Sequence, residues 1–346
     1  MQAKIAQRRF HRFISSDFSP AMAIAMLAVA SVMLFGYLIF RTIGLGPSVF
    51  GDEWTYSEFA RLTPLRKTGI PSFLFSTLFR TTSTCGTSFL ECARVLNVFW
   101  FVAAMPLIYG VASRFTPRRV AVVIAILTLL GPVSTYTALF MPESLYFTAF
   151  WLFVFAATGD RDSRGYAFGV GAALGVMALI KVHAFALVPG FLVVLVLDWM
   201  VTAPRGPVAR LVKDSLAFGL GFVVLRFLGG WILAGKVSFD IVGTFYRTQA
   251  ERLPPKSIVE TGLQSLEVLL HHVEVVGLLL GLGVAALLIG VLHWPRAQST
   301  AAQRKAWRFY LFALVVLGVV LTMTSYFTAA VVSNGASETL GRLHMR

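Results

Sequence analysis

The sequence predicts an all-α integral membrane protein with about nine transmembrane helices. Of its 346 residues, 57% are apolar and 13% are charged, which is more apolar surface than a soluble domain of this size can bury. Several uncharged runs reach or approach the ~20 residues that a helix needs to cross the ~30 Å hydrocarbon core of a bilayer. Runs of this length indicate helices rather than the strands of a barrel.

The first predicted element is a signal-anchor helix that follows a basic N-terminus, residues 1–19. This terminus resembles the basic start of a signal peptide, but the uncharged run from Phe18 to Phe40 is too long for one. No small-residue cleavage site follows it. We therefore expect the helix to be retained and the N-terminus to be cytoplasmic. The basic residues are Lys4, Arg8, Arg9 and Arg12.

The uncharged stretches predict a polytopic transmembrane domain over residues 20–331. With the N-terminus inside, each cytoplasmic loop contains basic residues, as the positive-inside rule requires. The net charge of +14 is therefore a topology signal, and we expect membrane lipids as partners and no nucleic acid. The nine spans are 20–40, 95–113, 120–138, 143–158, 165–181, 183–201, 215–235, 275–292 and 309–331.

Two outer loops, residues 41–94 and 236–274, are long enough to fold. The first mixes Pro and Gly with apolar and polar patches, which predicts short helices in the plane of the membrane interface. In the second, Ser257 and Glu260 form a capping-box signature. Apolar residues then step by four and three along one face, which predicts an amphipathic helix leading into the eighth span. These residues are Val259, Leu263, Leu266, Leu270 and Val273.

Paired acids beside the first span are the first candidate site. They belong to Gly51-Asp52-Glu53-Trp54-Thr55-Tyr56. A carboxylate inside a bilayer costs roughly 2.5 to 3.5 kcal/mol, so adjacent acids at a membrane surface face water, a cation or a substrate. Trp54 and Tyr56 prefer the interface and would hold the segment at the depth where a lipid-linked substrate presents its phosphate. Helix capping or solvation of the acids is the alternative.

A charged N-terminus, one span and an acidic pair followed by Tyr resemble the GT-C superfamily of polytopic membrane glycosyltransferases. This superfamily includes protein O-mannosyltransferases and aminoarabinose transferases. Besides Gly51 to Tyr56, the segment Met141-Pro142-Glu143-Ser144-Leu145-Tyr146-Phe147 is similar to the short acidic turn between the third and fourth spans of these enzymes. Lys181-Val182-His183 lies at the outer end of the fifth predicted span. The motifs that carry the resemblance lie in about the first 200 residues. Beyond them the likeness is mainly one of topology.

The resemblance implies an inverting transfer of a hexosyl or pentosyl group from a polyprenyl-phosphate donor. The acceptor would be a hydroxyl of a lipid, glycan or protein at the outer face of the plasma (inner) membrane. A base must deprotonate this hydroxyl, and the resemblance assigns that role to Asp52. Glu53 could hold the acceptor, hold a cation or cap the next helix, and Tyr56 is a candidate for substrate binding.

Three basic residues are candidates for binding the lipid phosphate that leaves. Lys181 and His183 could supply charge and hydrogen-bond donors, or they could be a snorkelling lysine and a packed histidine. Arg226 lies inside a predicted span and should face the bundle interior, either paired structurally or contacting the donor phosphate. Glu143 could bind sugar or acceptor, or it could simply begin the fourth helix, where an acid suits the helix dipole.

No cofactor is required by these patterns, although a divalent cation could take part. Cys85 and Cys92 lie in the first outer loop. An oxidising compartment would allow a disulfide between them, and separate burial is the alternative. Two cysteines without clustered histidines do not make a metal site, so we predict none. A nucleotide-sugar donor is disfavoured because the sequence contains no Gly-rich phosphate loop.

Two other functions fit parts of the sequence. A transporter or flippase of lipid-linked glycans would share the span count and the one-sided charges, but it needs binding groups near mid-membrane. Here the charges other than Arg226 cluster at one surface, which favours the enzyme. The outer C-terminal segment, residues 332–346, contains no closing helix. A noncatalytic fragment of a longer glycosyltransferase is therefore the third interpretation.

Overall fold

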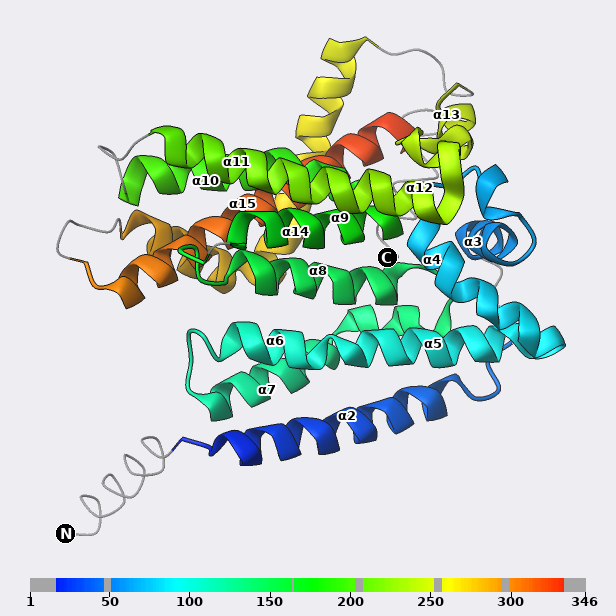
Figure 1. Ribbon diagram of the computed structural model, residues 1–346, viewed down its shortest axis with the longest axis horizontal. Helices are drawn as coiled ribbons and strands as arrows, with labels where there is room; N and C mark the ends of the chain where they lie inside the picture. Colours follow the sequence, from blue (N-terminus) through cyan, green and yellow to red (C-terminus); the bar gives the residue numbers. More distant parts are fainter. Residues whose placement is uncertain are drawn as a thin grey trace. The chain divides into compact units, whose positions relative to one another are not determined.

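The computed structural model describes residues 17–46, 51–163, 165–202, 208–251, 257–293 and 299–332. These residues form helices and no strand (Figure 1). The chain divides into two compact units. Several sequence predictions lie outside the described residues: most of the N-terminal segment 1–19 with its four basic residues, nearly all of the C-terminal segment 332–346, and the loop residues Arg164, Arg205 and Arg296.

The first unit comprises Met1–Leu65 and Leu74–Gly159. Its first described helix begins where the Ser19 hydroxyl accepts a hydrogen bond from the Met22 amide at 3.1 Å, with Pro20 in the first turn. This is a common N-terminal cap. Its elements are α2 (Pro20–Thr42), α3 (Gly51–Arg61), α4 (Phe73–Phe79) without its first residue, the 3₁₀ helix η2 (Arg80–Ser88), α5 (Phe89–Ala103), α6 (Met105–Ala112), α7 (Arg118–Leu129), the 3₁₀ helix η3 (Pro132–Ala138) and α8 (Glu143–Ala157).

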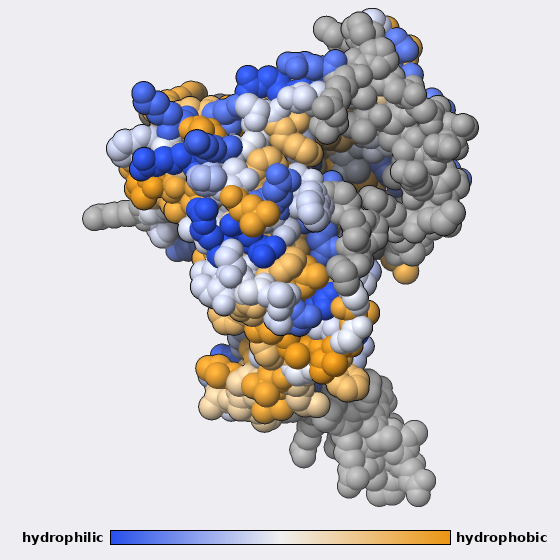
Figure 2. Space-filling view, turned by 90° about the vertical axis from the view of Figure 1, so that its right-hand side faces the viewer, coloured by the Kyte–Doolittle hydropathy of each residue, from blue (hydrophilic) through white to orange (hydrophobic). Residues whose placement is uncertain are grey.

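The core of the first unit lies between α2, α5, α6 and α7. One side of α2 packs into it through fully buried residues such as Ala23 and Leu38, against Phe101 and Met105. The other side of α2 exposes large apolar side chains, among them Phe40. In Figure 2 the lower end of the coloured surface, where α2 ends, is mostly hydrophobic. Such a face is suited to contact with lipid.

The second unit comprises Arg66–Phe73 and Asp160–Arg346. The short segment from the first outer loop is held by the Phe245 amide, which donates to the Gly69 carbonyl at 3.1 Å. The elements are the 3₁₀ helix η1 (Leu65–Lys67), which begins one residue before the unit, then α9 (Tyr166–Ile180), η4 (3₁₀, Val182–Ala186), α10 (Leu187–Thr202), α11 (Val208–Val223), η5 (π, Val224–Leu228), α12 (Gly229–Ala234), η6 (3₁₀, Gly235–Phe239), α13 (Gly243–Glu251), α14 (Ile258–Leu292) and α15 (Ala301–Val332).

Helices α9 and α11 of the second unit touch through glycines. A Cβ added at Gly171 would lie 1.9 Å from the Phe218 carbonyl oxygen, and one added at Gly221 would lie 2.2 Å from the Phe168 carbonyl oxygen. Gly175, one turn after Gly171, also packs against the backbone of this chain segment. Small residues at such spacing let two membrane helices approach closely.

Among the described residues, five helical segments are long and apolar enough to cross a membrane, or six if one bent pair counts as a span. This confirms an all-helical, multi-pass membrane protein, but it does not confirm the predicted count of nine. Two predicted spans, 143–158 and 165–181, correspond to shorter apolar helices, and the third, 275–292, is the C-terminal half of the 35-residue helix α14. The five segments are Pro20–Thr42, Phe73–Ala112, Val182–Val201, Val208–Thr248 and Ala301–Ala330.

The bent pair is α7 and η3, which meet at 52°. Pro132 explains the bend, because proline lacks the amide hydrogen that would continue the α-helix and clashes with the preceding turn. Within residues 41–94, α3 and α4 are short helices, and α4 also begins the candidate span Phe73–Ala112. The location of these helices in the membrane interface stays a prediction. The predicted cap of α14 is also present, since the Ser257 hydroxyl accepts from the Glu260 amide at 3.0 Å.

Candidate functional site

The acidic pair lies in the first turn of α3, where carboxylates interact favourably with the helix dipole. Asp52 is exposed. Glu53 is only 6% exposed, and its Oε1 accepts a hydrogen bond from the Phe140 amide at 2.7 Å. Successive helical residues point about 100° apart, so one acid faces solvent while the other faces the unit. The two predicted catalytic residues therefore occupy different environments.

Aromatic packing fixes α3 against its neighbours in the first unit. The ring of Tyr56, which is buried, meets Phe75 edge to face at 5.6 Å between centroids. Phe75 stacks on Phe79 at 4.2 Å, and both rings pack on Phe140. This cluster gives Tyr56 a packing role. Its predicted contact with substrate stays a prediction.

The main chain just before α8 is held by side chains from two other helices. The carbonyl of Ala138 accepts from Nε of Arg94 at 3.2 Å, and the carbonyl of Leu139 accepts from Nδ2 of Asn97 at 2.5 Å. With the Glu53 bond to Phe140, three consecutive residues are bound by side chains. Glu143 follows in the first turn of α8 and is half-buried. The predicted acidic turn is therefore rigidly supported.

Sequence reasoning missed Arg94 and Asn97. Arg94 directly precedes the predicted span 95–113 and was treated as its boundary, and Asn97 lies inside that span. A polar side chain within an apolar run was the available signal, because such groups need a partner inside the protein. The sequence offered no means of naming the partner, which lies more than forty residues away.

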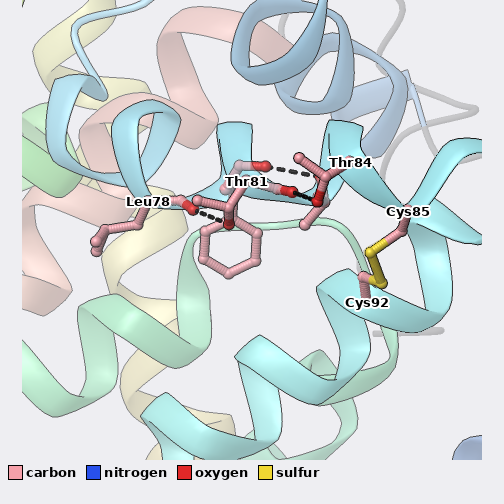
Figure 3. The surroundings of a disulfide bond; sticks show 7 residues. Leu78, Thr81, Thr84, Cys85 and Cys92 are labelled. Atoms are coloured by element: carbon pink, nitrogen blue, oxygen red, sulfur yellow. Dashed lines mark hydrogen bonds between the residues drawn. A yellow bond between two sulfur atoms is a disulfide. The ribbon is translucent and has the colours of Figure 1, made fainter.

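A disulfide joins η2 to α5 (Figure 3). It links Cys85 and Cys92, whose Cα atoms are 6.6 Å apart. The preceding turns are closed by side-chain hydrogen bonds from Thr81 to the Leu78 carbonyl at 2.7 Å and from Thr84 to the Thr81 carbonyl at 2.8 Å. Of the two alternatives for these cysteines, the disulfide is the one that the structure shows. It anchors the start of α5.

Arg226 is fully buried in the π-helical turn η5 of the second unit. Its Nη1 donates to the Ser238 carbonyl at 2.9 Å. Its guanidinium carbon lies 5.3, 5.4 and 5.3 Å from the ring centroids of Phe73, Phe185 and Phe227. This confirms that the side chain faces the interior. In the part of the chain that the structure describes, no carboxylate pairs with it, and its Nε and Nη2 are buried without a hydrogen-bond partner.

Lys181 and His183 lie at the junction of α9 and η4. Lys181 ends α9 in an extended conformation. The ring of His183 lies 5.1 Å from that of Phe327, and among the described residues its buried Nδ1 has no hydrogen-bond partner. Phe185, in the same short 3₁₀ helix, is one of the rings around Arg226. The second unit thus contains all three predicted phosphate-binding residues, while Asp52, Glu53, Tyr56 and Glu143 belong to the first.

Comparison with known families finds one similarity, in the middle part of the chain. Residues 81–229 match the family model of dolichyl-phosphate-mannose-protein mannosyltransferases. The predicted resemblance to GT-C glycosyltransferases is thereby confirmed. No curated protein and no solved structure matches the chain.

The mannosyltransferase match covers less than half of the chain and contains four of the candidate residues. Glu143, Lys181, His183 and Arg226 lie inside it, whereas the acidic pair of α3 precedes it. Together with the apolar helices, the match makes this part of the chain similar to membrane glycosyltransferases in general. The roles of the individual residues are not tested by it.

A buried ionic network in the second unit was also missed by sequence reasoning. Asp198 of α10 is 3% exposed and pairs with Arg161 and with Nε of Arg308, the latter at 2.9 Å. Arg161 also contacts Asp214 of α11 at 3.3 Å. Nearby, the Arg210 hydrogen bond of 2.6 Å lowers the pKa of the exposed Asp162 carboxyl. The network ties α10, α11 and α15 to the loop after α8.

A divalent cation stays an untested prediction. Across the described ranges, no group of three or more His, Cys, Asp or Glu residues could hold a metal ion. The two adjacent histidines of α14 illustrate this, because they diverge. His272 contacts the Ser325 hydroxyl at 3.1 Å, while His271 is exposed beside Glu274.

Proposed function

We propose that this protein transfers a hexosyl or pentosyl group from a polyprenyl-phosphate donor to an acceptor hydroxyl at the outer face of the plasma (inner) membrane. The observation that carries the proposal is the mannosyltransferase family match over the segment that contains Glu143, Lys181, His183 and Arg226. The reaction also needs a general base, and the exposed carboxylate of Asp52 in the first turn of α3 supplies it.

Asp52 acts as the base in this proposal. It takes the proton from the acceptor hydroxyl while the acceptor oxygen forms a bond to the anomeric carbon of the sugar. The bond between that carbon and the phosphate oxygen breaks, and the lipid phosphate leaves with the electron pair. A single displacement of this kind inverts the configuration at the anomeric carbon. The exposure of Asp52 supports the role because an acceptor must reach its carboxylate.

Glu53, Tyr56 and Glu143 complete the acceptor side. The Phe140 amide holds the Glu53 carboxylate at 2.7 Å, so Glu53 fixes the orientation of α3 and thereby of Asp52. Tyr56 contributes through its place in the aromatic cluster beside Phe75. Glu143, half-buried at the start of α8, binds a sugar or acceptor hydroxyl.

Lys181, His183 and Arg226 bind the donor phosphate in this proposal. The two buried nitrogens of Arg226 without a hydrogen-bond partner support it, because such a group gains substantially from a charged acceptor. A guanidinium can donate two parallel hydrogen bonds to phosphate oxygens. The aromatic rings at 5.3 to 5.4 Å attract the guanidinium charge and so offset part of the cost of burying it while no phosphate is bound.

The Cys85–Cys92 disulfide supports the outer-face location of the first loop. Disulfides persist in oxidising compartments and are rare in the cytoplasm. With one span before this loop, the N-terminus is then cytoplasmic. Basic loop residues on the opposite side, such as Arg114 and Arg161, agree with the positive-inside rule.

Transfer by the purified protein in nanodiscs tests the proposal. Radiolabelled polyprenyl-phosphate sugars are supplied with a cell-envelope extract as acceptor, and wild type, Asp52→Asn and Glu58→Gln are compared. Glu58 is an exposed acid of the same helix and serves as the matched control. We expect label in the acceptor with wild type and Glu58→Gln, and none with Asp52→Asn.

Other outcomes would change the assignment. Full activity of Asp52→Asn would remove this residue as the base. Labelled lipid that crosses the bilayer without any transfer would favour a transporter. Chelation with EDTA in the same assay tests the divalent cation, and an unchanged rate would exclude a dissociable metal.

A further inference from the structure

A single side chain, Arg94, ties together two segments that lead to the acidic residues of the first unit. Arg94 lies near the start of α5 and is 5% exposed. Its Nη1 donates to the Leu45 carbonyl at 2.9 Å, its Nη2 to the Gly46 carbonyl at 3.2 Å and its Nε to the Ala138 carbonyl at 3.2 Å. The guanidinium thus binds two parts of the chain at once.

These carbonyls belong to the two segments that precede the helices of the candidate acids. Leu45 and Gly46 follow α2 and precede α3, which contains Asp52. Ala138 ends η3, shortly before α8, which begins with Glu143. Ala138 lies two residues before Phe140, whose amide donates to Glu53 of α3, and five residues before Glu143. A change at Arg94 would therefore reach both α3 and Glu143 through this segment.

The backbone on both sides of Arg94 is itself fixed. Cys92, two residues earlier, is joined to Cys85 by the disulfide, and Asn97, one turn later, binds the next carbonyl of the same segment, that of Leu139. Arginine suits the position because its planar fork presents several N–H groups in fixed directions. A lysine ammonium keeps the charge but cannot span carbonyls on both sides.

We propose that Arg94 is a positioning residue for the transfer reaction, which fixes the segment before α3 relative to the segment before α8 and so orients Asp52 and Glu143. This inference rests on the proposed function. Misplacing a reacting group by about 1 Å can cost on the order of a hundredfold in rate. The effect therefore falls on kcat, while the donor, whose phosphate is bound by other residues, keeps its KM.

The test measures kcat and donor KM per mole of folded protein for wild type, Arg94→Lys, Arg94→Gln and Arg118→Gln in nanodiscs. Arg118 is the matched control: it also donates to a main-chain carbonyl, that of Phe18 at 3.2 Å, but it begins α7, and the start of α7 lies far from the start of α5 (Figure 1). We expect kcat to fall on the order of a hundredfold in Arg94→Gln and clearly in Arg94→Lys, with unchanged KM. Arg118→Gln should match the wild type.

The results distinguish this inference from the proposed function. A wild type that transfers no sugar overturns both. An active wild type with a wild-type kcat in Arg94→Lys overturns the inference alone, as does a raised donor KM without loss of kcat. If Arg94→Gln does not fold, Arg94→Lys decides, because it retains the charge and most of the volume.

Discussion

Oδ1 of Asp198 in α10 accepts a hydrogen bond from Nε of Arg308 in α15 at 2.9 Å, while Arg161 pairs with the same carboxylate. The carboxylate is thus shared by two cations that come from segments far apart in sequence. Its side chain is 4% exposed and that of Arg161 is 8% exposed. Water cannot readily replace Arg161 here, and Arg308, whose side chain is 35% exposed, links the same carboxylate to α15. The network is therefore a structural anchor for α15.

Replacing Asp198 should therefore destabilise the second unit. Asp198→Asn removes one of the two carboxylates that pair with the buried Arg161 guanidinium and leaves Asp214 as the other, which costs about 1 to 3 kcal/mol. Thermal unfolding in detergent, followed by tryptophan fluorescence, measures the loss. Asp162→Asn is the control. It removes the ion-pair partner of Arg210, but because the Asp162 side chain is 77% exposed, the substitution should change the unfolding midpoint little. Equal midpoints for the two variants would contradict the anchor role.

Two substitutions at Glu53 separate its hydrogen bond from its charge. Glu53→Gln retains a carbonyl oxygen that can accept from the Phe140 amide, and we expect it to keep folding and much of the transfer rate. Glu53→Ala leaves that buried amide unsatisfied at a cost of about 1 to 3 kcal/mol. Melting curves and transfer rates of both variants provide the measurement. An inactive Glu53→Gln with a wild-type melting curve would show that the carboxylate charge itself takes part in the reaction.

Arg226→Met should fold and lose donor affinity. Methionine fills a similar apolar volume among Phe73, Phe185 and Phe227, and replacing a buried charge by an apolar group is often neutral for stability. A lost charged hydrogen bond to phosphate, worth about 1.5 to 3 kcal/mol, raises the donor KM roughly tenfold or more. Kinetics at varied donor concentration test this. A wild-type KM would leave Arg226 with a packing role alone.

The disulfide gives a topology test and a stability test. Because the Cys85–Cys92 loop is short, removing the bond in Cys85→Ser/Cys92→Ser should cost about 2 kcal/mol. In intact cells, the wild type should react with a membrane-impermeant maleimide only after reduction. Labelling without reduction would mean that the bond does not form in the cell, and no labelling after reduction would argue against an outer location.

Local patterns were sufficient to predict much of the helical structure. The uncharged runs located the helices, and the Ser257 and Glu260 pair located the start of α14. The energetic cost of exposing a guanidinium to lipid was enough to predict that the Arg226 side chain faces the interior, where it is fully buried. Each of these conclusions depends on neighbours in sequence or on the bilayer, which a single sequence already specifies.

The partners of buried polar groups could not be predicted in the same way. Arg94 and Ala138 are 44 residues apart, and Asp198 and Arg308 are 110 apart. Which distant group meets a given charge depends on tertiary packing, for which charge and hydropathy patterns carry no signal. The predicted count of nine spans stays unconfirmed, because apolar helices such as Glu143–Ala157 and Tyr166–Ile180 have fewer residues than the ~20 that a straight helix needs to cross a bilayer.

The close approach of α9 and α11 at Gly171 and Gly221 leaves no space between the two backbones. Where a Cβ would already lie 1.9 to 2.2 Å from the facing backbone, an isoprene unit has no room to pass between the two helices. This seam is closed to lipid. The seam thus excludes one route for the tail of the proposed lipid-linked donor, and an alanine at either glycine would force the two helices apart.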